Sequence, residues 1–169
     1  MTTDGGAAGD RQTSPGAGGA EPDARTERTG IYWKPSLWAL ARSAYVADLD
    51  HDPGSPDAFV AWLGRALEQH AARTPAQRVA IAGDPQLQNV TGAGVNRSHP
   101  LQVRTIELVE QAVIADRGQL GRVVSRSAFA AEAVVAAAQA ARERIGRPLP
   151  PPPARLSNRP PRRPTRPVS

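Results

Sequence analysis

Apolar and polar positions in the first half of the chain follow the pattern of one strand and two helices. Residues 29–33 (TGIYW) form a short run rich in β-branched and aromatic side chains, which is typical of a strand. After Pro35 the apolar residues recur three and four positions apart, as on one face of a helix: Leu37, Leu40, Ala41, Ala44 and Tyr45. Proline suits the first helical position because its missing N–H has no partner there. Residues 50–54 (DHDPG) are turn formers and should end this helix.

A second and a third helix are predicted to follow. Ser55 offers an N-cap and Pro56 a first helical position. The apolar stripe of this second helix has the same spacing and consists of Phe59, Trp62, Leu63, Ala66 and Leu67. Residues 74–77 (TPAQ) are a capping box, so a short third helix should run from there to about residue 82. The Gly, Asn and Pro residues of segment 84–100 predict a linker.

Residues 101–145 carry a weaker form of the same pattern. Residues 101–104 alternate between apolar and polar side chains, and a helical stripe follows, made of Ile106, Val109, Val113 and Ile114. A last helix should run from Ser125 to about Arg144, and its opening SRSAFAA shares Ser, Ala, Phe and Ala with SPDAFVA from Ser55. Two interpretations stay open: a degenerate second copy of the strand–helix–helix unit, or a helical extension of the first. The weak second strand and the alanine-rich second core argue against the copy.

Both ends of the chain are predicted to be disordered. Residues 1–27 contain no large apolar side chain after the first methionine, so they cannot bury enough surface to offset their ordering entropy. They also lack the apolar core of a signal peptide. Residues 146–169 contain nine prolines, six arginines and no acid, which predicts an extended, solvated tail. The formal charge of the chain is +5, so the tail accounts for it and the rest is close to neutral. A basic tail suits phosphate binding, and a solubilising role is the alternative.

The composition of the chain limits the cellular compartments and the kinds of active site that are expected. The chain has no cysteine, which excludes disulfides and thiolate metal sites and fits a reducing cytoplasm. No apolar run is long enough to span a bilayer, so no membrane partner is expected. The acids of residues 48–52 resemble the start of a calcium loop, but the positions that need Gly and Glu hold Pro53 and Phe59. Residues 91–94 (TGAG) are too short for a dinucleotide fingerprint, and the three histidines lack ligand or triad spacing. The sequence therefore predicts a protein without enzyme activity, metal or cofactor.

Several motifs in residues 28–82 point to one known family. They are R-T-G-I-Y at the strand, A-R-S-A-Y in the first helix, S-P-D-A-F-V-A-W-L at the second and T-P-A-Q-R at the third. They resemble actinobacterial plasmid centromere-binding proteins of the ParB type, within the ribbon-helix-helix superfamily. The resemblance implies a mainly α fold in which two chains pair their strands antiparallel, and one strand with two short helices could not close a core alone. It also implies a homodimer that inserts its ribbon into the major groove of double-stranded DNA.

The resemblance further implies a partner, a location and a division of the chain. Proteins of this kind often contact a ParA-type ATPase through an unstructured N-terminal arm, where Arg11 and Arg25 are the basic side chains of this chain. The protein would then act in DNA partition, on plasmid or nucleoid DNA in the cytoplasm. The DNA-binding domain would span residues 28–83, with the linker and the helical segment after it. Two alternatives stay open: a transcriptional repressor or antitoxin-like regulator on the same fold, and a dimeric adaptor that docks partners through its Pro/Arg-rich tail.

Strand alternation assigns the side chains that would face DNA. If Ile31 and Trp33 point to the core, the residues between and beside them point away from it. The expected contacts of the first unit are Arg28, Gly30, Tyr32, Lys34 and Ser55, the last through the free N–H groups of a helix start. A second copy would add Gln102, Arg104, Ser125 and Arg126. Plainer alternatives are a core position for Tyr32, a solvated flank for Lys34 and an N-cap alone for Ser55.

Overall fold

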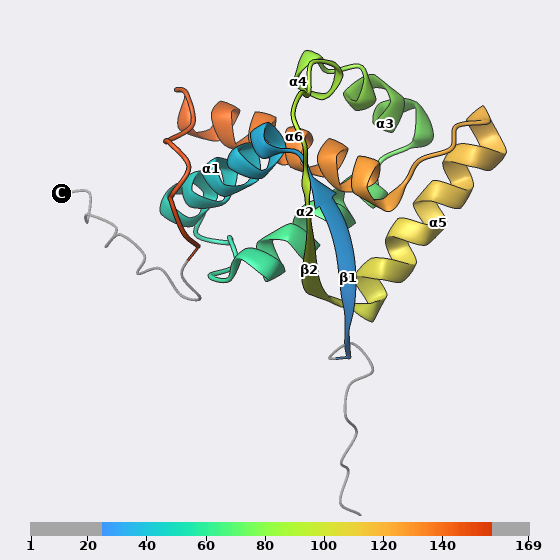
Figure 1. The fold of residues 1–169 in the computed structure, drawn as a ribbon, viewed down its shortest axis with the longest axis horizontal. Helices are drawn as coiled ribbons and strands as arrows, with labels where there is room; N and C mark the ends of the chain where they lie inside the picture. Colours follow the sequence, from blue (N-terminus) through green and yellow to red (C-terminus); the bar gives the residue numbers. More distant parts are fainter. Residues whose placement is uncertain (1–24, 157–169) are drawn as a thin grey trace, which may run out of the picture.

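Two strands from distant parts of the chain form one antiparallel ribbon (Figure 1). The computed structural model describes residues 25–156. Strand β1 spans Thr26–Trp33 and β2 spans Val95–Gln102, and Gly30 lies opposite Ser98 near the middle of the pairing. The strand that a second chain was expected to supply therefore comes from the same chain.

Each strand leads directly into a pair of helices. After β1 come α1 (Pro35–His51) and α2 (Phe59–Ala71), and after β2 come α5 (Val103–Leu120) and α6 (Arg126–Ile145). Two short helices, α3 (Pro75–Ala82) and α4 (Pro85–Gln88), connect the two sets. The described part is thus mainly helical, and a strand followed by two long helices occurs twice along it. We call β1–α1–α2 the first half and β2–α5–α6 the second half.

The helices of the two halves interlock. Helix α1 packs mainly against α6, and α2 packs against both α6 and α5, whereas the two helices of each half contact each other little. In the view of Figure 1, α6 crosses the middle of the molecule behind the ribbon. Neither half encloses a core of its own, so the two share one core.

Small side chains allow α6 to occupy this central place. Its ten buried residues are mostly alanine and valine: Phe129, Ala130, Ala131, Glu132, Ala133, Val134, Val135, Ala136, Ala138 and Ala141. Larger side chains from the first half pack around them, among them Trp33, Tyr45, Phe59 and Trp62. Because interiors are packed to crystal-like density, a helix that closely approaches several neighbours needs such small surfaces.

Two buried aspartates, each in the last turns of α1 or α5, connect the elements electrostatically. Asp48 of α1 accepts a hydrogen bond from Trp62 Nε1 at 2.8 Å and pairs with Arg144 of α6. Asp116 of α5 accepts from Arg78 Nη2 of α3 at 2.6 Å and also pairs with Arg122. Arg78 and Asp116 are almost completely buried, so each requires the other.

Helix α2 begins later than predicted. Its first residue is Phe59 and its N-cap is Ala58, so Ser55 is not the cap and Pro56 is not the first helical residue. The preceding segment forms a turn instead, in which the N–H of Ser55 donates to the carbonyl of Asp52 at 2.9 Å. The hydroxyl of Tyr45 donates to the carbonyl of Asp57 and holds the far side of this turn. Contacts with α1 thus outweigh the local capping signal.

Strand β2 begins and ends earlier than the sequence indicated. Residues 95–100, which were predicted to be linker, pair with β1, while Val103 and Arg104 belong to α5 rather than to a strand. Pro100 lies within β2, and a two-stranded ribbon tolerates it because neither strand has a neighbour on its outer side. The pairing with β1, not the composition of the segment, determines these bounds.

The first part of the Pro/Arg-rich tail lies on the fold, although its composition predicted a solvated chain. Gly146 adopts the left-handed conformation, φ 64°, and ends α6. Residues 148–156, which we call the strap, then run beside α1 (Figure 1). Leu149 and Leu156 of the strap pack against the core, and Arg42 of α1 donates to the carbonyls of Pro153 and Ala154. Residues 26–27 were predicted to belong to the disordered N-terminal arm, residues 1–27, but they are the first residues of β1, which starts before the predicted strand. The arm up to residue 24, with Arg11, and the tail from residue 157 lie outside the described residues.

Candidate nucleic-acid interface

One face of the ribbon is polar and open. Along β1, buried and exposed residues alternate as predicted, with Ile31 and Trp33 buried and Tyr32 exposed. The outward residues of the two strands lie opposite one another in the register: Thr26 and Gln102, Arg28 and Pro100, Gly30 and Ser98, Tyr32 and Asn96. The structure therefore brings four of the predicted residues, Arg28, Gly30, Tyr32 and Gln102, onto a single face.

The inner face of the ribbon is fixed by an aromatic cluster. Trp33 Nε1 donates to Nε2 of His99 at 3.0 Å, and the His99 ring also lies near Trp38 and Phe59. Burial, assisted by the charge of Arg97, lowers the pKa of His99. A neutral imidazole is the form that can accept the Trp33 hydrogen bond. This hydrogen bond joins β1 to β2 on the inner face of the ribbon and so helps to fix the orientation of the outer face.

Tyr32 and Lys34 hold the segment that leads into β2. The Tyr32 hydroxyl accepts from the N–H of Gly94 at 2.7 Å, and Lys34 Nζ donates to the carbonyl of Gly92 at 2.8 Å. The Lys34 ammonium also lies 5.6 Å from the centre of the Tyr32 ring, within cation–π range. A side chain at Gly94 would collide with that ring, its Cβ only 2.6 Å away. Tyr32 and Lys34 thus also fix the position of the segment before β2, a role that the sequence did not indicate.

Gly30 leaves room at the middle of the ribbon. A Cβ built on Gly30 would lie 3.1 Å from the side-chain oxygen of Asn96, so the missing side chain lets the Asn96 amide cross the ribbon. Asn96 and Ser98 come from the segment predicted to be linker, and their site role was missed for that reason. In segment 95–102 (VNRSHPLQ) the buried residues His99 and Leu101 alternate with exposed ones. This short alternation is the sequence feature that could have indicated a strand with Asn96 and Ser98 on its outer face.

Ser55 does not belong to this surface. It is 2 % exposed and lies in the turn before α2, four residues ahead of the helix. A phosphate contact through this serine, predicted from a helix start at Ser55, is therefore wrong, because no helix begins there.

The remaining predicted residues lie at helix starts of the second half. Gln102 is the N-cap of α5, and Arg104 is exposed in the first turn of that helix rather than on a strand. Ser125 is the N-cap of α6, where its hydroxyl accepts from the N–H of Ala128 at 3.1 Å. Arg126 is exposed beside it, and its Nη2 lies 3.5 Å from Oε1 of Glu110.

The start of α6 approaches the ribbon at one point. The backbone N–H of Tyr32 donates to the hydroxyl of Ser127 at 2.9 Å, so the first turn of α6 lies directly beside the end of β1. A helix start with its N–H groups and an arginine is a suitable neighbour for a bound phosphate. Arg126 and Ser125 are thereby placed next to the polar face, although they are not part of it.

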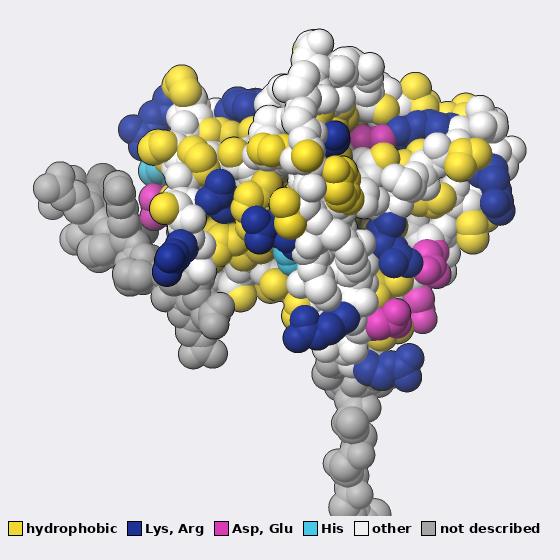
Figure 2. Space-filling model, in the orientation of Figure 1, with side chains coloured by type: hydrophobic (Ala, Val, Ile, Leu, Met, Phe, Trp, Pro, Cys, Tyr) yellow, Lys and Arg dark blue, Asp and Glu magenta, His cyan; other side chains and the backbone are white. Residues whose placement is uncertain are grey.

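Charge is unevenly distributed around the ribbon. In Figure 2, Lys and Arg side chains gather over α1 and beside the ribbon, and acidic side chains gather over the beginning of α5. Arg97 of β2 lies with its guanidinium 4.5 Å from the ring centre of Trp38, whose position the sequence left unassigned. Arg42 approaches the same ring at 5.6 Å.

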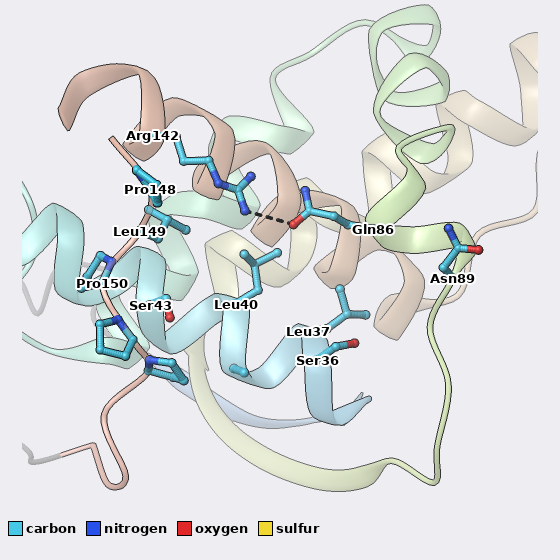
Figure 3. Close-up of a pocket in the computed structure, with 13 residues that line it drawn as sticks. Ser36, Leu37, Leu40, Ser43, Gln86, Asn89, Arg142, Pro148, Leu149 and Pro150 are labelled. Atoms are coloured by element: carbon cyan, nitrogen blue, oxygen red, sulfur yellow. Dashed lines mark hydrogen bonds between the residues drawn. The ribbon is translucent and has the colours of Figure 1, made fainter. Parts of the chain in front are cut away.

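One pocket lies away from the ribbon. It has a volume of about 590 Å³ and opens between α1, α4, the end of α6 and the strap. Figure 3 shows Leu37 and Leu40 on one side, the strap prolines on another, and the hydrogen bond from Arg142 to Gln86 across the top. The residues that line it include no carboxylate, histidine or cysteine.

Two further searches concern the described residues alone. Nowhere in residues 25–156 do three His, Asp or Glu side chains cluster closely enough to hold a metal ion. None of the helices in that range combines the length and the apolar character needed to cross a membrane. Comparisons of the chain with protein-family models, with curated proteins and with solved structures gave no match.

Proposed function

We propose that this chain is a sequence-specific DNA-binding protein of the ribbon-helix-helix type, with both strands of the ribbon in one chain. The observation that carries the proposal is the two-stranded antiparallel ribbon with its exposed polar face above interlocked helices. The major groove is wide enough to admit such a ribbon. No chemical step is proposed for the protein.

The outward side chains suit the edges of base pairs. Arginine binds guanine through two hydrogen bonds, and asparagine or glutamine binds adenine in the same way. Arg28, Asn96 and Gln102 provide these groups, and Ser98 can donate or accept. Gly30 leaves the space at the centre of the ribbon in which the Asn96 amide lies.

Backbone contacts are proposed at the start of α6. Ser125 and Arg126 lie beside the end of β1, where N–H groups and a positive charge can bind a phosphate. The start of α2 is less suitable, because exposed Asp57 precedes it and would repel a phosphate.

The biological role is proposed from the sequence resemblance. We propose a centromere-binding component of a ParA/ParB-type partition system, with the N-terminal arm as the contact for the ATPase. A transcriptional repressor or antitoxin-like regulator would use the same ribbon, and the neighbouring gene would separate the two: an ATPase gene favours partition, a toxin gene favours the regulator. An adaptor that acts through its prolines is less favoured, because residues 148–153 already lie against α1.

The test measures binding to repeats upstream of the protein's own gene, by fluorescence anisotropy over a range of salt concentrations. Arg28→Ala should weaken binding to the preferred duplex by about 1–3 kcal/mol, roughly 5- to 150-fold, and reduce discrimination against a scrambled duplex. Arg117→Ala, an exposed arginine far along α5, is the matched control and should bind like the parent protein. Equal affinities of the two variants would show that the ribbon is not the reader. Binding without salt dependence would favour the adaptor.

A further inference from the structure

The two strands present different side chains at corresponding positions. Lys34 and Gln102 are the N-caps of α1 and α5, and aligning the halves on them gives the correspondence. Arg28 then corresponds to Asn96, Gly30 to Ser98 and Tyr32 to Pro100. A symmetric dimer presents the same side chain twice and therefore reads a palindromic site. This ribbon has no such repetition at its outward positions.

The flanks of the ribbon differ in charge as well. Helix α1 carries Arg42 and has no acid before Asp48, whereas the first turns of α5 carry exposed Glu107 and Glu110 together with exposed Arg104. In the same alignment Glu110 corresponds to Arg42, so the sign of the charge is reversed. In Figure 2 acidic side chains gather near the start of α5, among Lys and Arg side chains, whereas Lys and Arg predominate over α1 beside the ribbon.

On the α1 flank an arginine lies over a tryptophan ring, and the α5 flank has no equivalent pair at the corresponding position. The guanidinium of exposed Arg97 lies over Trp38 at 4.5 Å, an arrangement that supports the group while its N–H edge stays available to an oxyanion. Arg42 anchors the strap, which places exposed Arg155 on the same side. On α5 the residue that corresponds to Trp38 is Ile106, a core residue.

We propose that the chain binds duplex DNA in a single orientation, on a site that is not palindromic. The unequal half-ribbons read different bases. The α1 flank contacts phosphates more strongly, through Arg97 and Arg155, than the start of α6, where Glu110 competes with a phosphate for Arg126. The proposal rests on the DNA-binding function proposed above and adds the polarity of the complex.

Resonance energy transfer tests the orientation directly. The parent chain has no cysteine, so single cysteines can be labelled specifically. A donor is placed at Ser36→Cys on α1 or at Gln111→Cys on α5, both exposed positions. The acceptor is placed at one end or the other of the shortest duplex that the protein binds specifically. We expect the Ser36 donor to transfer better to one end and the Gln111 donor to the opposite end.

Equal transfer to both ends, with specific binding intact, would overturn the single orientation and leave the proposed function standing. Failure of every duplex to bind the unlabelled protein would overturn both. Labelled variants are used only after their affinity is shown to match that of the parent protein, and other exposed positions on the same helices replace any variant that fails this requirement.

A pair of charge variants tests the flanks. Arg97→Gln should weaken binding and lower the slope of log K against log salt by about one, as loss of one phosphate contact requires. The matched variant is Arg126→Gln on the other side, where Glu110 already pairs with the arginine. Its effect on the slope should be clearly smaller. Equal effects of the two variants would overturn the asymmetric phosphate contacts.

Discussion

The two halves of the molecule have the same order of elements but fill the shared core with different side chains. Six of the seven aromatic residues lie between Tyr32 and Trp62, in the first half, and the second half contributes only Phe129. The second half instead supplies the alanine- and valine-rich surface of α6. The large rings and the small surface are complementary, so each half supplies what the other lacks.

This comparison shows that a segment poor in large apolar side chains can lie at the centre of a core. The alanines of α6 bury little area each, and the sequence therefore made the second half look peripheral. Yet α6 contacts the ribbon, α1 and α2, because its small residues permit close approach on several sides. Apolar area per residue is thus a poor guide to the place of a helix in an interlocked fold.

The largest effect is expected from removing a ring from either half. Trp62→Ala and Phe129→Ala should each lower the free energy of unfolding by about 3–5 kcal/mol, since both side chains are buried. Urea denaturation followed by circular dichroism measures this loss. If the core is shared, both variants unfold in one transition. Two separate transitions, each sensitive to one variant, would contradict the interlocked description.

The two buried aspartates should differ in their dependence on arginine. Arg78→Ala should cost about 3 kcal/mol, because it leaves Asp116 buried with Arg122 as its remaining partner. Arg144→Ala should cost less than about 1 kcal/mol, since the Arg144 side chain is 37 % exposed and Asp48 keeps its Trp62 hydrogen bond. Unfolding midpoints of the two variants compare them, and equal losses would contradict this ranking.

A pH titration tests the hydrogen bond between Trp33 and His99 on the inner face of the ribbon. The pKa of His99 is lowered in the folded protein, so the unfolded chain binds the proton more readily. The stability from His99 is therefore complete above about pH 6.5 and is lost as the pH falls below it. Burial also lowers the pKa of His70 beside Glu132, which acts in the same direction. Unfolding midpoints at about pH 7.5 and about pH 5 measure the sum.

His99→Gln separates the two histidines. The glutamine oxygen can accept the Trp33 hydrogen bond without titrating, so this variant should lose less stability on acidification than the parent protein. An unchanged pH dependence would mean that His99 contributes nothing to it.

The smallest effect concerns the starts of the second helices. Ser125 caps α6 with its hydroxyl, and Ser125→Ala should cost about 1 kcal/mol. Ala58 stands at the corresponding place of α2 with extended backbone and no side-chain cap, so Ala58→Ser should stabilise by about 0.5 kcal/mol. Thermal unfolding resolves both changes. A loss of stability in Ala58→Ser would show that the turn before α2 does not accommodate a cap.

Features encoded locally were predictable from the sequence. The first strand, α1 and the capping box at Thr74 follow from periodicity and from side chains that act within a few residues of their own position. The outward direction of Tyr32 follows from the alternation of a strand in the same way. Strand β2 could not be delimited, because VNRSHPLQ is mostly polar and becomes a strand by pairing with β1 far away in the sequence.

Contacts between distant segments account for the other differences. Two hydrogen bonds join residues more than fifty positions apart: Lys34 donates to Gly92, and Arg42 donates to Pro153 of the strap. The late start of α2 has the same origin, since the turn before it is held by Tyr45 of α1. Composition alone therefore described the strap as free chain, and local rules alone placed Ser55 at a helix start.

The covalent link between the strands changes how the ribbon depends on the amount of protein. Ribbons built from two chains form by a second-order step, so dilution separates them, and related chains in one cell can exchange partners. Here α3, α4 and the segment up to Val95 tether β2 to β1, and closure of the ribbon is intramolecular. The ribbon then forms at any copy number, in proportion to the number of chains, and needs no strand from another chain.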